Sequence, residues 1–404
     1  MKAADAPTAA RRLAVADVGR AGVLRGYGVW LTAAVVLMVL PWVVRTGAAV
    51  PIMNQMGIAI VFALSFNMLL GQGGMLSFGH AVYFGLGGLA FAALFGTFST
   101  SRAGTVFSMV SLAVAELMAA SSLIFDRFFG GEEGITTNRA KAPLLLGLEF
   151  TRDRQVYYLI AFWVLLAAIA MYAFSRTPIG RMANAVRDNP ERAEFIGYSQ
   201  RWVRYISFCA AGFFAGIAGG LFALNYEILT AENMGLNASG VVLLMTFIGG
   251  IGSFVGPILG AIVFTFLQSM LSDYTGIWLL YLGILFLATV LFVPIGMAGV
   301  LMLHAPAWRA RRVGRLAGPY LVAGVCGLVA AVGVIGLLEM LHALVAADTP
   351  SGVRRLFWTA VSLRSVLPWL VFTGLAAAGA LGLRWAGPRA AAAFADANRA
   401  GAGR

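Results

Sequence analysis

Charged residues are scarce in this chain of 404 residues. They make up 11% of it, whereas hydrophobic residues make up 60% and the mean hydropathy is +0.85. A soluble domain carries roughly 25% charged residues, so the composition excludes an ordinary soluble protein. We expect an all-α fold: a polytopic transmembrane helical bundle of about 10–11 spans with one broken or re-entrant glycine-rich segment.

The residues that build catalytic and metal sites are equally scarce. The three histidines lie far apart in the sequence, and the two cysteines, Cys209 and Cys326, fall inside apolar segments, so neither a metal motif nor a disulfide framework is indicated. Neither of the two lysines, Lys2 and Lys141, follows a glycine, which excludes the GxxxxGK[ST] loop that binds ATP phosphates. We therefore expect no enzyme, cofactor or metal site in this chain. If the protein pumps a solute, ATP and magnesium must act on a partner.

The net charge of +12 comes from arginines that lie between apolar blocks. This distribution is typical of cytoplasmic loops in membrane proteins and argues against nucleic-acid binding. Residues 1–28 carry five basic side chains and no clear cleavage site follows the first apolar run, so we expect a cytoplasmic tail and a retained first span.

Apolar runs predict the remaining organisation. The permease-like domain is expected at residues 29–304, and residues 305–404 form a C-terminal extension with two apparent spans. Spans are predicted at 29–44, 50–70, 104–125, 156–174, 205–225, 238–271 (two spans around a glycine-rich turn at 249–257), 277–293, 316–344 and 366–383. The tail and the basic stretch at 176–204 should both be cytoplasmic, which requires an even number of crossings between them. The glycine-rich segment at 71–96 is therefore expected not to cross simply, and the loop at 126–155 to be extracytoplasmic.

The basic stretch, residues 176–204, reads as a short helical hairpin between two spans. Asn189 is suited to cap a helix whose first residue is Pro190, and Gly197 to end it in a left-handed conformation. A second short helix is expected at 180–187. A disordered linker would lack these caps and the apolar stripe of Ala193, Phe195 and Ile196. The bland alternative is a solvated positive-inside loop.

Four stretches in this order resemble the permeases of branched-chain amino-acid ABC importers, of the LivM type. They are LSFNMLLGQGGMLSFGHAVYFGLGG (64–88), GTVFSMVSLAVAELMAASSLIFDRFFGGEEGI (104–135), GRMANAVRDNPERAEFIGYSQ (180–200) and LLMTFIGGIGSFVGPILGA (243–261). The resemblance covers roughly residues 29–300, about three quarters of the chain. The two apparent spans beyond residue 305 depart from the pattern.

The resemblance implies a permease subunit that works by alternating access in a bacterial inner membrane. Its partners would be ABC ATPase subunits, a second related permease and a periplasmic solute-binding protein. The solute would be a branched-chain amino acid or a related small molecule such as urea, an amide or an aromatic acid. The residues expected to couple to the ATPases are Arg181, Arg187, Asp188, Glu191, Ala193, Glu194 and Gly197. Ala193, Phe195 and Ile196 would pack into a groove of the ATPase, and Arg187 and Arg192 would pair at its rim.

Several side chains along the expected translocation path can be interpreted in two ways. Glu116, in mid-span, either faces the path or bonds to another helix, since an unpaired carboxylate in lipid is costly. Ser77 and His80 either cap an interrupted helix or contact the solute, and Asn67 lies in the same stretch. Glu339 and His342 form either a satisfied pair or part of a proton path.

Two glycine-rich stretches are more readily explained by structure. Gly212, Gly216 and Gly220 are expected to serve helix packing. FFGGEEGI (128–135) is expected to form a tight turn whose exposed acids are available to a solute-binding protein.

Two other classes of protein remain open. An ion-coupled secondary transporter would also have broken segments and a carboxylate in mid-membrane, although it gives no reason for a capped cytoplasmic hairpin. A membrane-embedded enzyme is the second alternative, against which the lack of clustered polar groups within the spans argues.

Overall fold

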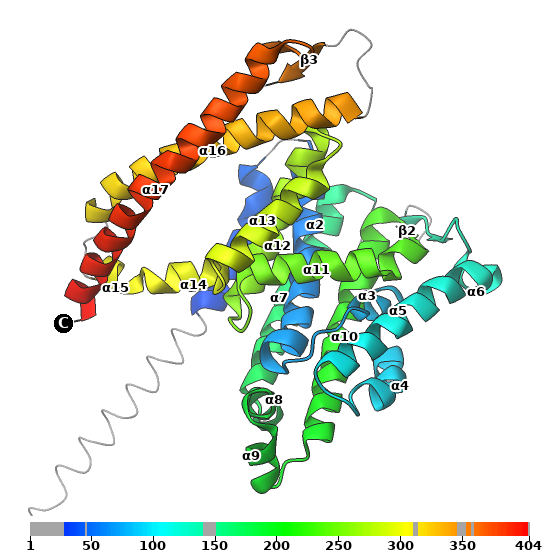
Figure 1. Cartoon of the computed structure of the whole chain (residues 1–404). Coiled ribbons are helices and arrows are strands. Elements are labelled where there is room, and N and C mark those ends of the chain that lie inside the picture. Colours follow the sequence, from blue (N-terminus) through cyan, green and yellow to red (C-terminus); the bar gives the residue numbers. More distant parts are fainter. Residues whose placement is uncertain are drawn as a thin grey trace, which may run out of the picture. The chain divides into compact units, whose positions relative to one another are not determined.

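The computed structural model describes residues 28–44, 47–139, 151–309, 314–345, 353–356 and 359–402. Most of the predicted N-terminal tail, Lys141 with its neighbours, and Arg311 and Arg312 lie outside these residues. The chain divides into two compact units, Met1–Gly299 and Val300–Arg404, and helices dominate both (Figure 1).

Long apolar helices form the first unit, as hydropathy predicts. The principal ones are α2 (Ala49–Asn67), α4 (Leu89–Ser99), α5 (Thr105–Ile124), α7 (Asp153–Arg176), α10 (Gln200–Tyr226), α11 (Leu236–Gly249), α12 (Val255–Tyr274) and α13 (Trp278–Phe292). The boundary between the units falls within α14 (Gly296–Leu303). The core lies where α2, α7, α10, α11 and α12 pack together, around large buried side chains such as Phe66, Phe208 and Phe264.

Among the described residues, seven helices are long and apolar enough to cross a membrane, or eight if the bent pair at 278–308 is one span. Three shorter apolar helices, Gly28–Val43, α4 and α11, occupy further segments that the sequence marks as apolar. The polytopic helical bundle is confirmed. The long-helix count is below the predicted number of spans because the helices at two predicted spans, Gly28–Val43 and α11, are among the shorter ones, whereas α4 lies in the segment that was expected not to cross.

The glycine-rich segment is broken, as predicted. The helix that begins with α2 continues as a π-helix, η1 (Met68–Gln72), and then gives way to irregular backbone before the short α3 (His80–Gly85). Gly87 and Gly88, both at positive φ, turn the chain into α4. Glycine is required there because φ values of 74° and 72° strain any residue with a Cβ.

The glycine turn between α11 and α12 is also confirmed. Gly249, Gly256 and Gly260 bring the two helices into backbone contact, because a Cβ at any of them would meet backbone atoms of the facing helix or of the turn. Such close approach is how small residues hold helices together in lipid.

One predicted packing position is wrong. Gly212 and Gly216 of α10 face Ala92 and the Gly87–Gly88 turn, as expected for packing residues, but nothing lies within 4 Å of the position of a Cβ on Gly220. Gly219 instead lies against the Phe84 backbone of α3. The step of three rather than four follows from the helical period of 3.6 residues, which drifts off a strict four-residue repeat.

The predicted extracytoplasmic loop is described at residues 126–139 and 151–155, and it begins with a tight turn. After the short α6 (Asp126–Phe129), three glycines at positive φ turn the chain into β1 (Ile135–Thr136), which pairs antiparallel with β2 (Ile228–Leu229). Arg139 then bridges Asp153 and Glu227, each at 2.8 Å. The charge of Arg139 is thus neutralised by two carboxylates.

The second unit is a pair of long helices packed side by side, α16 (Gly314–Val345) and α17 (Val366–Ala402), preceded by α15 (Ala305–Arg309) (Figure 1). A hairpin of β3 (Val353–Leu356) and β4 (Thr359–Ser362) lies between them in sequence. The two predicted C-terminal spans correspond to α16 and α17. Glu339 is buried in α16 and His342 is half-buried.

Candidate coupling hairpin and translocation residues

The basic stretch folds into two capped helices, α8 (Pro178–Asp188) and α9 (Pro190–Phe195), between the long α7 and α10 (Figure 1). Each helix starts with a proline, and the residue before it is the cap. The Thr177 hydroxyl accepts from the Gly180 N–H at 3.2 Å, and the Asn189 side-chain oxygen accepts from the Arg192 N–H at 3.0 Å. The caps satisfy N–H groups that have no partner within the helix. The Asn189 cap is as predicted, and α8 begins two residues earlier than expected.

The hairpin ends as its glycine predicts. Gly197 has φ +89° and its N–H donates to the Glu194 carbonyl at 2.9 Å, while the Tyr198 N–H reaches back to Ala193 at 3.1 Å. These bonds satisfy the last carbonyls of α9 and direct the chain into α10. The hairpin is therefore a built element rather than a solvated linker.

The three residues of the apolar stripe along α9 do not all face outward, which corrects the expectation that all three would pack into a groove of the ATPase. Ala193 is 1% exposed and packs inside the hairpin against Ala183, Val186 and Val203, so it is not available to a groove of another protein. Phe195 and Ile196 are 88% and 66% exposed. An outward-facing apolar pair at the tip of a polar hairpin is typical of a contact surface. Of the charged candidates, Arg181, Asp188, Glu191 and Glu194 are exposed as well.

Arg187 does not lie free at a rim, which is a second correction. Its guanidinium donates to the Gly71 carbonyl of η1 and pairs with Asp188 at 2.9 Å. Its aliphatic stem passes over Gly74, where a Cβ would collide with it. Arg187 thus ties the hairpin to the broken glycine-rich segment of the bundle.

Asn67 extends this tie to the other glycine turn. Its side-chain oxygen accepts from the Gly252 N–H, and its side-chain nitrogen donates to the Ser253 carbonyl, both at 3.2 Å. The side chain is 2% exposed. Asn67 and Gly71 are one turn apart on the α2–η1 helix, so this helix end is held by the hairpin on one side and by the α11–α12 turn on the other.

Ser77 and His80 are buried within the chain's own packing, at 0% and 1% exposure. The His80 Nε2 lies 2.9 Å from the Ser65 hydroxyl, and its ring stacks on Phe62 at 5.6 Å between centroids. The Ser77 hydroxyl and the His80 Nδ1 have no hydrogen-bond partner in the described structure. These contacts place both residues in the core that surrounds α3.

Glu116, unlike Ser77 and His80, is exposed on the outside of the chain. It lies mid-way along α5 on the exposed side of that helix, next to Leu117, which is 59% exposed. Among the described residues it has no hydrogen-bond or ion-pair partner, so it does not join two helices of this chain. A carboxylate in mid-span is tolerated where it meets water or another subunit rather than lipid tails. The four predicted path residues are therefore split between the interior, which holds three, and the outer face of α5.

Three features of the site escape sequence reasoning. The partner of Arg187 is separated from it by 116 residues, and those of Asn67 and Arg139 are also distant in sequence. The one local signal is an asparagine, Asn67, next to a glycine-rich stretch, because its side-chain amide can hydrogen-bond to exposed backbone groups. Within the described ranges, no three His, Cys, Asp or Glu side chains gather as metal ligands.

Comparison with known proteins identifies the class. The family model described as "Branched-chain amino acid transport system / permease component" matches residues 93–294, half of the chain, including the hairpin and the α11–α12 turn. The chain belongs to this permease family. It is a permease subunit of the ABC-importer class, a transport component rather than an enzyme.

Two LivM proteins match longer stretches of the chain than the family model does. The high-affinity branched-chain amino acid transport system permease protein LivM of Escherichia coli K12 is 27% identical over 296 residues, 63% of this chain and 69% of LivM. LivM of Salmonella typhimurium is 25% identical over 313 residues, 65% of this chain and 72% of that protein. The guanosine ABC transporter permease protein NupQ of Bacillus subtilis is 29% identical over 126 residues, 31% of this chain and 39% of NupQ. No solved structure matches.

Proposed function

We propose that this permease imports branched-chain amino acids, or small solutes of related chemistry such as urea, amides or aromatic acids, across a bacterial inner membrane. The support is the similarity to LivM over about two thirds of the chain, which is far longer than the similarity to the guanosine permease. The complete importer would contain two ATPase subunits, a second related permease and a periplasmic solute-binding protein.

The hairpin of α8 and α9 is the proposed contact with an ATPase. The observation that carries this is the exposed pair Phe195 and Ile196 at the end of a helix that is capped at both ends. Capping fixes the direction of the pair at little further cost in entropy, as a contact that transmits force requires. Arg181, Asp188, Glu191 and Glu194 surround it with charge for a polar rim, and Gly197 sets the angle at which α10 leaves.

Movement of the hairpin would reach the membrane domain through Arg187. Its bond to Gly71 acts on the end of the α2–η1 helix, and Asn67 on the same helix end acts on the α11–α12 turn. A π-helical turn is a place where a helix changes register readily, and such turns are frequent at functional sites. Binding of ATP to the partner subunits would thus change the conformation of both glycine-rich breaks at the same time.

The solute path would run along the outer face of α5, between this chain and the second permease, with Glu116 lining it. Asn67, Ser77 and His80 would then act as positioning residues that hold the broken helices beside the path. This assignment follows from their burial and from the exposure of Glu116.

The coupling contact is tested by exchanging one exposed ring. Phe195→Ser removes apolar contact area without opening a cavity, since the side chain is 88% exposed in this chain alone. We expect the variant to reach the membrane at normal levels and to lose the co-purifying ATPase. Phe128→Ser is the matched control, because Phe128 is 71% exposed on α6 and should leave ATPase recovery unchanged. Equal ATPase recovery with Phe195→Ser and with the wild type would contradict the assignment.

A further inference from the structure

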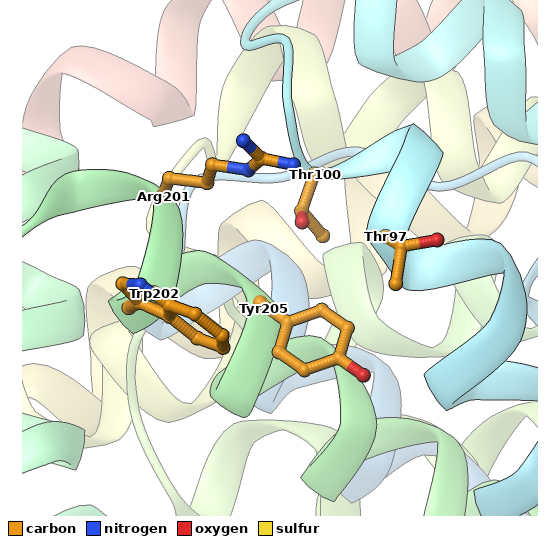
Figure 2. Close-up of a pocket in the computed structure, with 5 residues that line it drawn as sticks. All are labelled: Thr97, Thr100, Arg201, Trp202 and Tyr205. Carbon is orange, nitrogen blue, oxygen red and sulfur yellow. The ribbon is translucent and has the colours of Figure 1, made fainter.

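A cavity of about 310 Å³ lies beside the first two turns of α10. Arg201, Trp202 and Tyr205 of α10 line one side of it, and Thr97 and Thr100 at the C-terminal end of α4 line the other (Figure 2). The Trp202 and Tyr205 rings meet edge to face at 5.8 Å between centroids, so they form a fixed aromatic wall.

The three hydroxyl groups that line the cavity are available to a ligand as hydrogen-bond acceptors. The hydroxyls of Thr97, Thr100 and Tyr205 lie 2.7, 2.7 and 3.2 Å from backbone carbonyls to which they donate, and the Tyr205 hydroxyl also contacts the Cys209 side chain. Each hydroxyl oxygen therefore presents lone pairs. Arg201 contributes the single cation, and it has no ion pair with any described residue. The cavity thus offers one strong site for an anion at Arg201. Its hydroxyl oxygens and aromatic rings offer a second site, for a group that donates hydrogen bonds or carries positive charge.

We propose that this cavity binds the headgroup of phosphatidylethanolamine. The phosphodiester would pair with the Arg201 guanidinium, whose planar fork suits phosphate oxygens. The ammonium group, which has only donors, would meet the three hydroxyl oxygens and the aromatic faces. A headgroup with phosphate but no donor would satisfy only half of the cavity.

The position of the cavity favours a lipid over a soluble phosphate ester. It opens directly after the hairpin, at the level of the cytoplasmic membrane surface if the proposed function is right, where tryptophan and tyrosine gather in membrane proteins. Trp202 is 63% exposed, and Phe98 beside Thr97 is 70% exposed, so acyl chains have apolar surface to lie on. Basic pockets between helices on this side of a membrane are known sites for lipid headgroups.

The test measures bound lipid and is independent of transport. The purified full chain in detergent is titrated with phosphatidylethanolamine, phosphatidylglycerol or phosphatidylcholine of identical acyl chains, and bound lipid is counted by native mass spectrometry. We expect selective retention of one phosphatidylethanolamine, reduced by about 10-fold or more in Arg201→Gln, because a charge-assisted hydrogen bond is lost. Arg102→Gln is the matched control, since it removes an exposed charge just beyond α4 and outside the cavity lining.

Thr97→Val provides a second variant that keeps the cavity's shape but removes one acceptor. It should lower the preference for phosphatidylethanolamine over phosphatidylglycerol while both still bind. Equal retention of all three lipids, or equal loss with Arg201→Gln and Arg102→Gln, would overturn the proposal in favour of non-specific lipid. Displacement of the lipid by soluble phosphoethanolamine at comparable concentration would overturn the lipid assignment and indicate a soluble phosphate ester.

Discussion

Replacing Arg187 by alanine should uncouple the ATPases from solute movement without dismantling the importer. In the structure, Arg187 makes two polar contacts, a charged hydrogen bond to the Gly71 carbonyl and an exposed ion pair with Asp188. The first kind of contact contributes about 1.5–3 kcal/mol. The second contributes about 0–1 kcal/mol, because solvent screens it. The free energy of unfolding should therefore fall by about 2 kcal/mol. This is less than the total stability of a typical domain, so the variant should remain folded.

The effect on transport should be larger than the effect on stability. Without Arg187, the hairpin remains capped by Thr177 and Asn189 and still presents Phe195, so the ATPase should still bind. Its movement, however, would no longer act on the α2–η1 helix end. We expect uptake to fall by about 10-fold or more, the factor that 1.4 kcal/mol of lost coupling energy produces, while ATP hydrolysis continues.

The assay compares solute uptake with ATP hydrolysis in proteoliposomes that contain the complete importer. Asp188→Asn separates the two contacts, because it removes the ion pair and keeps the bond to Gly71; its uptake per ATP hydrolysed should exceed that of Arg187→Ala. Arg154→Ala controls for the loss of one positive charge, because Arg154 is exposed near the start of α7 and lies outside the hairpin. Normal uptake per ATP hydrolysed with Arg187→Ala would refute the mechanical link.

Three further predictions concern the bundle and the second unit. Glu116→Gln should slow uptake while leaving the melting temperature unchanged, since the carboxylate has no partner among the described residues; a lower melting temperature at normal uptake would assign it a structural role. Asn67→Ala leaves the Gly252 N–H and the Ser253 carbonyl without partners and should cost about 2 kcal/mol. That corresponds to a melting temperature lower by roughly 5 °C in differential scanning fluorimetry, against little change for Asn184→Ala. Deleting residues 305–404 should leave ATPase co-purification intact, since the proposed contact lies wholly in the first unit; loss of the ATPase would show that the extension takes part in assembly.

Local chemistry explains why so much of the hairpin could be predicted. A cap, a first-turn proline and a terminal glycine each act on backbone groups within four residues of themselves, so the ends of α9 can be predicted from Asn189, Pro190 and Gly197 alone. The long spans follow from hydropathy for the same reason, because in lipid each helix satisfies its own backbone. The broken segment at 71–96 and the glycine-rich turn at 249–257 could be predicted in the same way, from their local glycine content.

What failed depends on where distant segments meet. The sequence pattern of α9 does not say that Ala193 faces Val203 while Phe195 faces outward, because that direction is set by how α8 and α10 pack around it. The contact of Gly219 rather than Gly220 follows from the position of the Phe84 backbone. The direction of Glu116 similarly depends on which face of α5 packs on α3. Each of these required the tertiary arrangement.

The most direct test of the central claim is solute uptake by the reconstituted permease. The chain, its co-purified ATPases and second permease are placed in liposomes with the solute-binding protein outside, and uptake of labelled leucine is measured with and without ATP inside. The account predicts uptake that requires both ATP and the binding protein and that disappears with Phe195→Ser. Uptake by this chain alone, driven by an ion gradient and indifferent to ATP, would contradict it and identify a secondary transporter.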